Sequence, residues 1–331
     1  MHKIVVIGSN CFSGSHFVNM AIEQGSDVIG ISRSCEPASV FLPYKWKDRP
    51  GLGNFKFFQY DINHDIEKII DVIKDQQPEY VVNFAAQGMV SESWNNPDQW
   101  FQTNTLSVAR LIKCLCELSF LKKYVQVSTP EVYGSNNGSI VENINYCPST
   151  PYAVSKAAAD MTLTAYYHTY GFPVVFTRAA NVFGPGQQLY RIIPRTILYC
   201  FLGKQLPLHG GGYSIRSFIH IKDVINGTIK AMLNAEPGEI FHFSTLETIT
   251  IRDLIKKIAK MMAVSFEDLV VESGERAGKD QAYILDCSKA EHKLDWKPNI
   301  GLEQGIVETI KWVSDNLDEL KKIPFDYVHK K

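Results

Sequence analysis

The sequence predicts an α/β fold built on a doubly wound parallel sheet. Short apolar runs at residues 3–8, 27–32, 55–60, 80–84 and 124–128 alternate with stretches of helical periodicity. Runs of this length, rich in β-branched residues, are typical of strands buried on both faces. Strands that alternate with helices indicate a parallel sheet, whose ligands gather at the carboxyl ends of the strands. The residues that follow each run are therefore the first candidates for a binding site.

The first strand, turn and helix indicate dinucleotide binding. The run at residues 3–8 ends at a glycine, and a helix is expected to follow the turn and continue to about residue 24. Such a turn places the helix N-terminus against a pyrophosphate. Cys11 takes the place of the middle glycine in the usual fingerprint, and it is nearly as small. The turn residues expected at the cofactor are Gly8, Asn10, Cys11, Phe12, Ser13 and Gly14.

The end of the second strand bears on the choice between NAD and NADP. An acidic residue at this point would bind the ribose diol of NAD. This chain has Ser32 followed by Arg33. Neither residue repels a 2′-phosphate, and a guanidinium can pair with one. The sequence therefore favours NADP, whereas an Arg33 that only stacks on adenine would leave NAD as the cofactor.

The later strand ends add further candidate cofactor contacts. An acid and an apolar residue after the third strand can flank an adenine ring, and small residues after the fourth strand allow close approach of a cofactor. A long helix is expected over residues 99–118, after a helix at 66–74. The residues concerned are Asp61, Ile62, Ala85, Ala86, Gln87 and Asn104.

A tyrosine and a lysine four residues apart form the expected chemical centre. Pro151 suits the first turn of a helix, so Tyr152 and Lys156 lie on one face of it. An ammonium beside a phenol is expected to lower the phenol's pKa and make it a usable acid and base. A hydroxyl from Ser128 or Thr129, at the end of the fifth strand, is expected to complete the group.

Composition excludes several other classes. The 331 residues are 45% hydrophobic and 21% charged, which fits an ordinary soluble enzyme of one or two domains. A net charge of −1 gives no reason to expect nucleic acid or an anionic membrane as a partner. The seven cysteines have no metal-ligand or disulfide spacing. We expect no signal peptide, no membrane span, no metal and a cytoplasmic location.

Motifs along nearly the whole chain resemble those of extended short-chain dehydrogenase/reductases, and among them the nucleotide-sugar 4,6-dehydratases. Their order and spacing resemble the dTDP-glucose 4,6-dehydratases most, whereas the region of Arg33 is similar to the GDP-mannose 4,6-dehydratases. The motifs lie at residues 128–134, 150–158, 177–185, 206–212 with Arg216, 276–280 and 294–298.

The resemblance implies a Rossmann-type sheet and a smaller C-terminal α/β domain for the substrate. Residues 1–180 would form the dinucleotide domain, to which segments around 215–245 return, and residues 181–331 would mainly bind the nucleotide sugar. A homodimer is also implied. The substrate would be a nucleoside-diphosphate hexose, with contacts from Val90, Ser93, Asn181, Arg191, Pro207, His209, Arg216, Arg276 and Asp280.

The resemblance also implies an internal redox cycle. Tyr152 would take the C4 hydroxyl proton as hydride leaves, Lys156 would hold the cofactor ribose, and Thr129 would bond the sugar hydroxyl. Glu131 would then remove the C5 proton, water would leave C6, and the hydride would return to C6. Glu131 suits this role because it is the only ionisable group within residues 128–132.

One residue departs from the dTDP-glucose dehydratase pattern. Pro130 stands where that family has an aspartate that protonates the departing C6 hydroxyl, and proline has no proton to give. The acid would then be Glu131 itself, a water, or the Tyr133 hydroxyl. Two alternatives stay open: a 4-epimerase or 4-oxidoreductase, and a catalytically silent dinucleotide-binding homologue with Cys11 and Pro130 as marks of lost activity.

Overall fold

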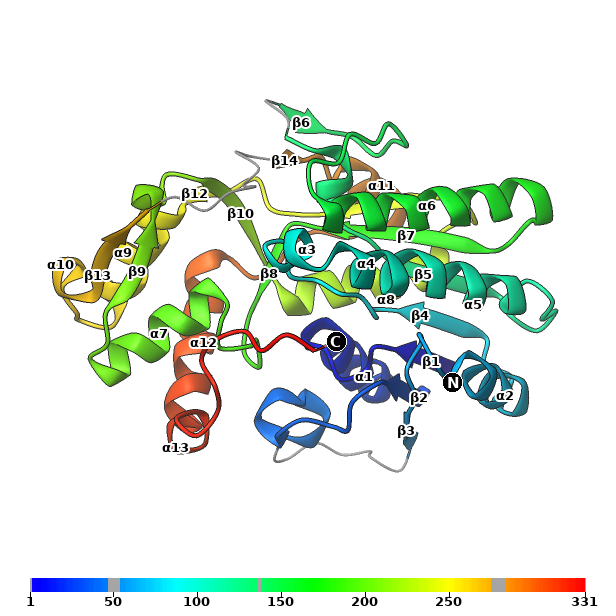
Figure 1. Ribbon diagram of the computed structural model, residues 1–331, viewed down its shortest axis with the longest axis horizontal. Coiled ribbons are helices and arrows are strands. Elements are labelled where there is room, and N and C mark those ends of the chain that lie inside the picture. The colour runs from blue at the N-terminus through cyan, green and yellow to red at the C-terminus, as the bar shows by residue number, and fades with distance from the viewer. Residues whose placement is uncertain (1, 47–53, 136–137, 275–283, 331) are drawn as a thin grey trace.

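A seven-stranded parallel sheet forms the centre of the computed structural model, which describes residues 2–46, 54–135, 138–274 and 284–330 (Figure 1). The strand order is β3-β2-β1-β4-β5-β7-β11, and every pairing is parallel. This order confirms the doubly wound sheet. The strands are β1 Lys3–Ile7, β2 Asp27–Ser32, β3 Phe55–Gln59, β4 Tyr80–Asn83, β5 Lys123–Val127, β7 Val174–Ala179 and β11 Ile240–Phe243.

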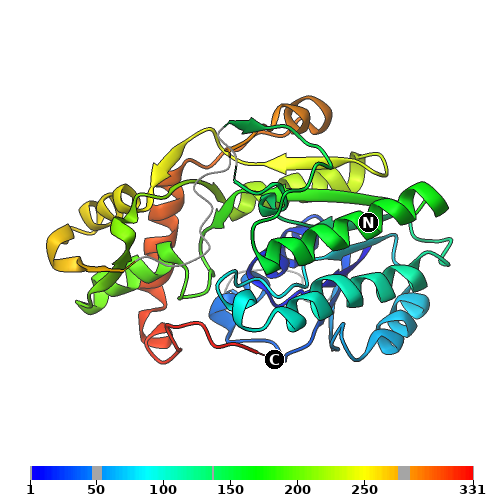
Figure 2. The ribbon, with the colours of Figure 1, turned by 45° about the horizontal axis from the view of Figure 1, so that its top comes forward.

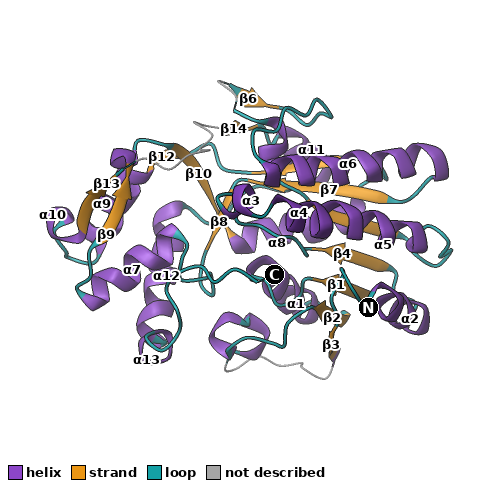
Figure 3. Ribbon diagram, viewed as in Figure 1, coloured by secondary structure: helices purple, strands orange, loops and turns teal. Residues whose placement is uncertain are grey.

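Helices cover both faces of this sheet (Figure 3). Because side chains alternate along a strand, Val5 and Ile7 pack on one side and Ile4 and Val6 on the other. The first side is covered by α2 Ile66–Gln76, α5 Ser107–Leu115 and α6 Pro151–Tyr170. The second side is covered by α1 Phe12–Glu23 and α8 Ile221–Asn234. The carboxyl ends of the strands are left for ligands.

Smaller sheets and their helices stand beyond the carboxyl ends (Figure 2). One sheet joins β8 Asn181–Phe183, β10 Ile215–His220 and β12 Thr248–Thr250, and another pairs β9 Leu206–His209 with β13 Val270–Ser273. The helices here are α7 Ile192–Leu202, α9 Ile251–Met261, α10 Phe266–Leu269, α12 Leu302–Asp315 and α13 Leu317–Leu320. They have apolar cores of their own. The remaining pieces are β6 Ser139–Ile140, which pairs with β14 Ile284–Leu285, and α11 Ser288–Leu294.

The helix expected over residues 99–118 is three segments. It begins as α4 Pro97–Phe101, passes through a π-helical segment η4 Gln102–Leu106, and ends as α5 at Leu115. Short π-helical segments are rare and recur at functional sites because they redirect side chains. The other strands and helices predicted with bounds begin and end within two residues of them. Within the described residues, no helix is long and apolar enough to span a bilayer.

Candidate active site

The glycine turn after β1 packs directly against the end of β4. Gly8 has a φ of +86°, and a Cβ there would lie 2.6 Å from the backbone nitrogen of Ala85. A Cβ on Gly14 would lie 2.2 Å from the Gly8 carbonyl oxygen. Cys11 needs no such space, because its Sγ caps α1 by accepting the Gly14 N–H at 3.2 Å. This tight cradle at a helix N-terminus fits a pyrophosphate.

Two expected cofactor ligands at this turn hold the protein's own loop. The Asn10 N–H donates to the Ser32 Oγ at 3.0 Å, and the Asn10 amide donates to the Ser34 carbonyl at 3.0 Å. Ser32 is buried. These bonds fix the loop at residues 32–34 beside the glycine turn, and contacts of Ser32 and Asn10 with the cofactor stay a prediction. Arg33, partly exposed, extends from that loop.

Asn104, a predicted cofactor contact, connects the segment that follows β4 to α6 through hydrogen bonds of its side chain. Its Oδ1 accepts the Gln87 N–H at 2.8 Å, and its Nδ2 donates to the Gln87 carbonyl at 3.1 Å and to the Ser155 Oγ at 2.9 Å. The residue is 1% exposed and lies in the π-helical segment. Both ends of the amide form internal bonds, so Asn104 positions Gln87, and its own contact with a cofactor stays a prediction.

Ser93 and Asp61 also make internal contacts. Ser93 has no exposed surface, and its hydroxyl donates to the Val90 carbonyl at 2.6 Å; its contact with a substrate stays a prediction. Asp61 accepts the Asn63 N–H at 2.8 Å and stays partly exposed at the β3 end. Ile62 beside it is buried.

Thr129, Glu131 and Tyr152 meet at the end of β5. Thr129 caps the 3₁₀ turn η5 Pro130–Tyr133, accepting the Glu131 N–H at 3.3 Å, and its hydroxyl also bonds to Tyr152. Burial and then the Glu131 carboxylate raise the pKa of Tyr152, whereas the Thr129 hydrogen bond and the Arg191 charge lower it. Thr129 is therefore the hydroxyl that completes the group. Arg191, exposed at the start of α7, joins it from the other half of the chain.

Lys156, one helical turn after Tyr152 on α6, bonds to the end of β5. Its Nζ donates to the Val127 carbonyl at 2.8 Å, and the side chain is buried. Burial lowers the pKa of Lys156 to about 8, with Asp160 opposing the shift and Arg178 adding to it. Burial raises the pKa of Tyr152, and the lowering of that pKa by the Lys156 ammonium stays a prediction.

A buried charge network lies directly behind Lys156. Asp160, one helical turn further along α6, forms an ion pair with Arg178 at 2.9 Å, and both side chains are fully buried. Ser128 donates its hydroxyl to the same Asp160 oxygen at 2.6 Å, and its contact with a cofactor stays a prediction. Arg178 also bonds to the Tyr133 and Tyr146 hydroxyls.

The network excludes Tyr133 as the acid for the departing hydroxyl. Its hydroxyl lies 2.8 Å from the His242 Nε2 and bonds to Arg178, and the residue is 5% exposed. Burial raises the pKa of Tyr133, because the charged phenolate is unfavourable in this buried network. Tyr133 therefore does not readily give up its proton. Of the three acids considered from the sequence, Glu131 and a water remain.

The expected substrate ligands lie in several places. Asn181 donates to the Ser217 carbonyl at 3.1 Å, and an Arg216 nitrogen donates to the Ile215 carbonyl at 2.7 Å. Pro207 and His209 lie on β9, and the His209 Nδ1 is 3.1 Å from the Gly274 carbonyl. Only Arg191 among these is seen to act on Tyr152. Arg276 and Asp280 lie outside the described residues.

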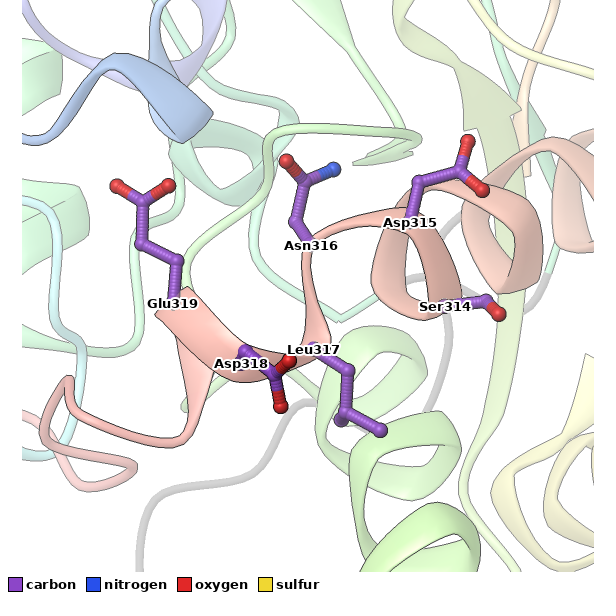
Figure 4. A pocket seen from close by; sticks show the side chains of 6 residues that line it. All are labelled: Ser314, Asp315, Asn316, Leu317, Asp318 and Glu319. Atoms are coloured by element: carbon purple, nitrogen blue, oxygen red, sulfur yellow. The ribbon is translucent and has the colours of Figure 1, made fainter.

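Other surfaces offer less chemistry. A hollow of about 400 Å³ lies at the turn between α12 and α13, where Asp318 and Leu317 point away from Asn316 and Asp315 (Figure 4). It lies on elements other than those that carry Tyr152. In the described ranges, no group of three or more His, Cys, Asp or Glu side chains is placed to hold a metal.

Comparison with known proteins places the whole chain in one family. The family model for GDP-mannose 4,6 dehydratase matches residues 5–309. A dTDP-glucose 4,6-dehydratase of Streptomyces antibioticus is 32% identical, over 97% of this chain and 96% of its own length. The corresponding enzyme of Haemophilus influenzae is 30% identical, over 94% of this chain and 98% of its own.

Solved structures agree with these relatives. A dTDP-glucose 4,6-dehydratase of Streptomyces venezuelae, solved with NAD and the ligand TYD, has a TM-score of 0.88, 28% identity, and covers 96% of this chain and 98% of its own. A UDP-glucose 4-epimerase of Thermotoga maritima, solved with UDP-glucose, has a TM-score of 0.86, 27% identity, and covers 95% and 99%. The fold, the glycine cradle and the family match lead to one conclusion: the chain belongs to the GDP-mannose 4,6-dehydratase family.

Proposed function

We propose that the protein is an NAD(P)-dependent nucleotide-sugar 4,6-dehydratase that converts a nucleoside-diphosphate hexose to its 4-keto-6-deoxy product. The observation that carries this proposal is the meeting of Thr129, Glu131 and Tyr152 at one strand end. A plain 4-epimerase has no use for a carboxylate beside its tyrosine, whereas dehydration needs a base for the C5 proton. The dehydratases among its relatives support the same reaction.

Each side chain has a distinct task in this proposal. Tyr152 takes the C4 hydroxyl proton, and the Thr129 hydroxyl holds the same sugar oxygen. NAD(P), held at the glycine cradle of Gly8 and Gly14, would supply the hydride chemistry at C4 and C6. Glu131 removes the C5 proton, which the new 4-ketone makes acidic, and water leaves C6. Lys156, whose pKa is about 8, holds the cofactor ribose as an ammonium below that pH.

The proton for the departing C6 hydroxyl comes from Glu131 in this proposal. Pro130 has none to offer, and Tyr133 is committed to the buried network. Glu131 acquires a proton when it deprotonates C5. The same carboxyl can then give this proton to the departing C6 hydroxyl, directly or through a water. One residue then serves as base and acid in succession.

The cradle around Gly8, Gly14 and Ala85 fits a dinucleotide, as in the relatives solved with NAD. We propose residues 1–180 as the cofactor domain and residues 181–331 as mainly the substrate domain. Two contacts support the return of the chain around residues 215–245 to the first domain. β11 joins the large sheet, and α8 packs on α1. The cytoplasmic location stays a prediction.

Product analysis tests the proposal. The protein is incubated with dTDP-, UDP-, GDP- and CDP-hexoses, and the products are measured by mass and by ketosugar absorbance in alkali. A dehydratase gives, with at least one donor, a product lighter by one water. An unchanged mass with a new sugar would identify the 4-epimerase alternative. Cofactor binding without turnover of any donor would identify the silent homologue.

We also propose a homodimer formed through α4, η4 and α6. These segments pack side by side (Figure 1) and expose Phe101, Leu106, Val154 and Met161, which are 38%, 43%, 38% and 59% exposed. Adjacent exposed apolar side chains mark an interface more often than isolated ones do.

Met161→Glu is expected to convert the dimer to a monomer, because it places a charge on the most exposed of these apolar side chains. Size-exclusion chromatography with light scattering measures the mass. Val307→Glu, at a residue 54% exposed on α12, is the matched control and should leave the dimer intact. A wild-type protein that is monomeric at every concentration would contradict the proposal.

A further inference from the structure

The last described residues form a strap between the two halves of the molecule. Residues 325–330 follow α13, and Figures 1 and 2 show this red segment running from α13 back to the half that holds the seven-stranded sheet. On the substrate side it is fixed to α7: Asp326 forms an ion pair with Arg195 at 2.7 Å, and the Tyr327 ring packs edge-on against Tyr190 at 5.3 Å. The strap therefore starts beside Arg191.

On the cofactor side the strap is fixed through His329. Its ring stacks on Trp100 with 5.5 Å between centroids and 8° between planes, and its Nε2 lies 2.7 Å from the Gln99 Oε1. Its Nδ1 lies 3.2 Å from the Tyr327 hydroxyl. Trp100 has no exposed surface. A stacked ring and two polar contacts hold this segment in one position.

Lys330 then joins the two walls of the dinucleotide cradle. Its carbonyl accepts from the Gln87 amide at 2.9 Å and from the Arg33 guanidinium at 3.3 Å, while its Nζ lies 3.4 Å from the Ser34 Oγ. Gln87 follows β4, and Arg33 and Ser34 follow β2. Because β1 lies between β4 and β2 in the sheet, Lys330 links the segments that follow the two neighbours of β1.

This crossing brings a second cation to the loop that ends β2. Arg33 and Lys330 are tied together by a hydrogen bond, and the Lys330 ammonium reaches the hydroxyl next to Arg33. Like charges gathered in one place repel each other, and a bound anion removes that repulsion. The end of β2 is where the adenosine ribose of a dinucleotide lies in this fold. A 2′-phosphate there carries the charge that two cations suit.

We propose that Lys330, delivered by the strap, determines cofactor specificity by pairing with the 2′-phosphate of NADP beside Arg33. The inference rests on the dinucleotide cofactor of the proposed function. It adds a residue from the far end of the chain to a subsite otherwise built from the β2 loop. The strap also links that subsite to α7 and to Tyr190, next to Arg191, so it tethers the cofactor and substrate halves.

Dinucleotide titration tests this role without any turnover. Wild type, Lys330→Gln and a control, Lys321→Gln, are freed of bound dinucleotide, and the dissociation constants for NADPH and NADH are measured by reduced-nicotinamide fluorescence. Lys321 is an exposed lysine on the same terminal segment whose partner is Asp318. Lys330→Gln should weaken NADPH binding about three- to fivefold, the range for an exposed ion pair, and change NADH binding less than twofold. The NADPH effect should shrink as salt rises.

The outcomes separate the inference from the function beneath it. Equal effects on NADPH and NADH, or tighter NADPH binding by Lys330→Gln, would overturn the inference, the latter showing that the strap competes with the cofactor. Wild type that binds NADH and not NADPH would overturn it too, while the proposed dehydratase stands. Wild type that binds neither coenzyme would remove both. Because one exposed side chain is changed, loss of folding does not obscure the result.

Discussion

Glu131→Gln is expected to stop the loss of water while C4 oxidation continues. The amide keeps the shape of the side chain, but it cannot take the C5 proton or return one to C6. Loss of a general base in such a position lowers the rate about 10²- to 10⁴-fold. The 4-keto-6-deoxy product is measured by mass, and exchange at C5 is followed by deuterium uptake from heavy water.

Glu67→Gln, an exposed carboxylate on α2, is the control and should leave the rate unchanged. The cofactor of the Glu131→Gln protein should accumulate in its reduced form when substrate is added, because hydride return requires the eliminated product. Deuterium uptake at the wild-type rate would show that another group removes the C5 proton, and the assignment of Glu131 would fail.

Asp160→Asn is expected to lower the free energy of unfolding by about 3–5 kcal/mol, the usual cost of breaking a buried ion pair by removing one partner. Arg178 would remain fully buried with a neutral neighbour. Denaturant unfolding measures the change. The control is Asp315→Asn, which breaks a 2.8 Å ion pair with Lys311 on the surface of α12, and it should cost about 0–1 kcal/mol. Equal losses from the two changes would contradict the argument.

The same variant should shift the pH profile of kcat/KM. The ammonium of Lys156 is lost as pH rises through about 8, so activity should fall there. Because Asp160 raises this pKa, its neutralisation should move the alkaline fall to lower pH. The free energy of unfolding changes in the opposite direction. Between pH of about 8 and the ordinary lysine pKa of 10.5, Lys156 binds more protons in the unfolded chain than in the folded one. Stability therefore rises with pH over that window. An unmoved alkaline limb would show that Asp160 acts only through folding.

The sequence predicted those parts of the site whose positions follow from backbone geometry. Strand ends in a parallel sheet share an edge, so Gly8, Ala85 and Thr129 could be brought together from the strand pattern. Tyr152 and Lys156 were placed on α6 by their spacing. The direction in which the pKa of Tyr152 shifts could not be predicted from this spacing, because burial and the Glu131 charge raise it.

The sequence could not predict the partners of polar side chains that have a choice. Ser128 and Asn104 bond to Asp160 and Gln87, which only the packed structure brings near, and their contacts with a cofactor stay predictions. One signal was available: Asp160 is four residues after Lys156, hence on the same helix face, and Arg178 lies in an apolar strand where a charge needs a partner. The strap carried no motif, and its contacts come from tertiary structure alone.

The position of β11 has a consequence for synthesis of the chain. β7 ends at Ala179, and its outer neighbour β11 begins at Ile240, with the β8–β10 sheet and α8 between them in the sequence. A chain emerging from the ribosome therefore presents β7 as an open, apolar sheet edge until β11 arrives. Unpaired edges of this kind invite pairing with other chains, so a partly made molecule has greatest need of chaperone protection during that interval.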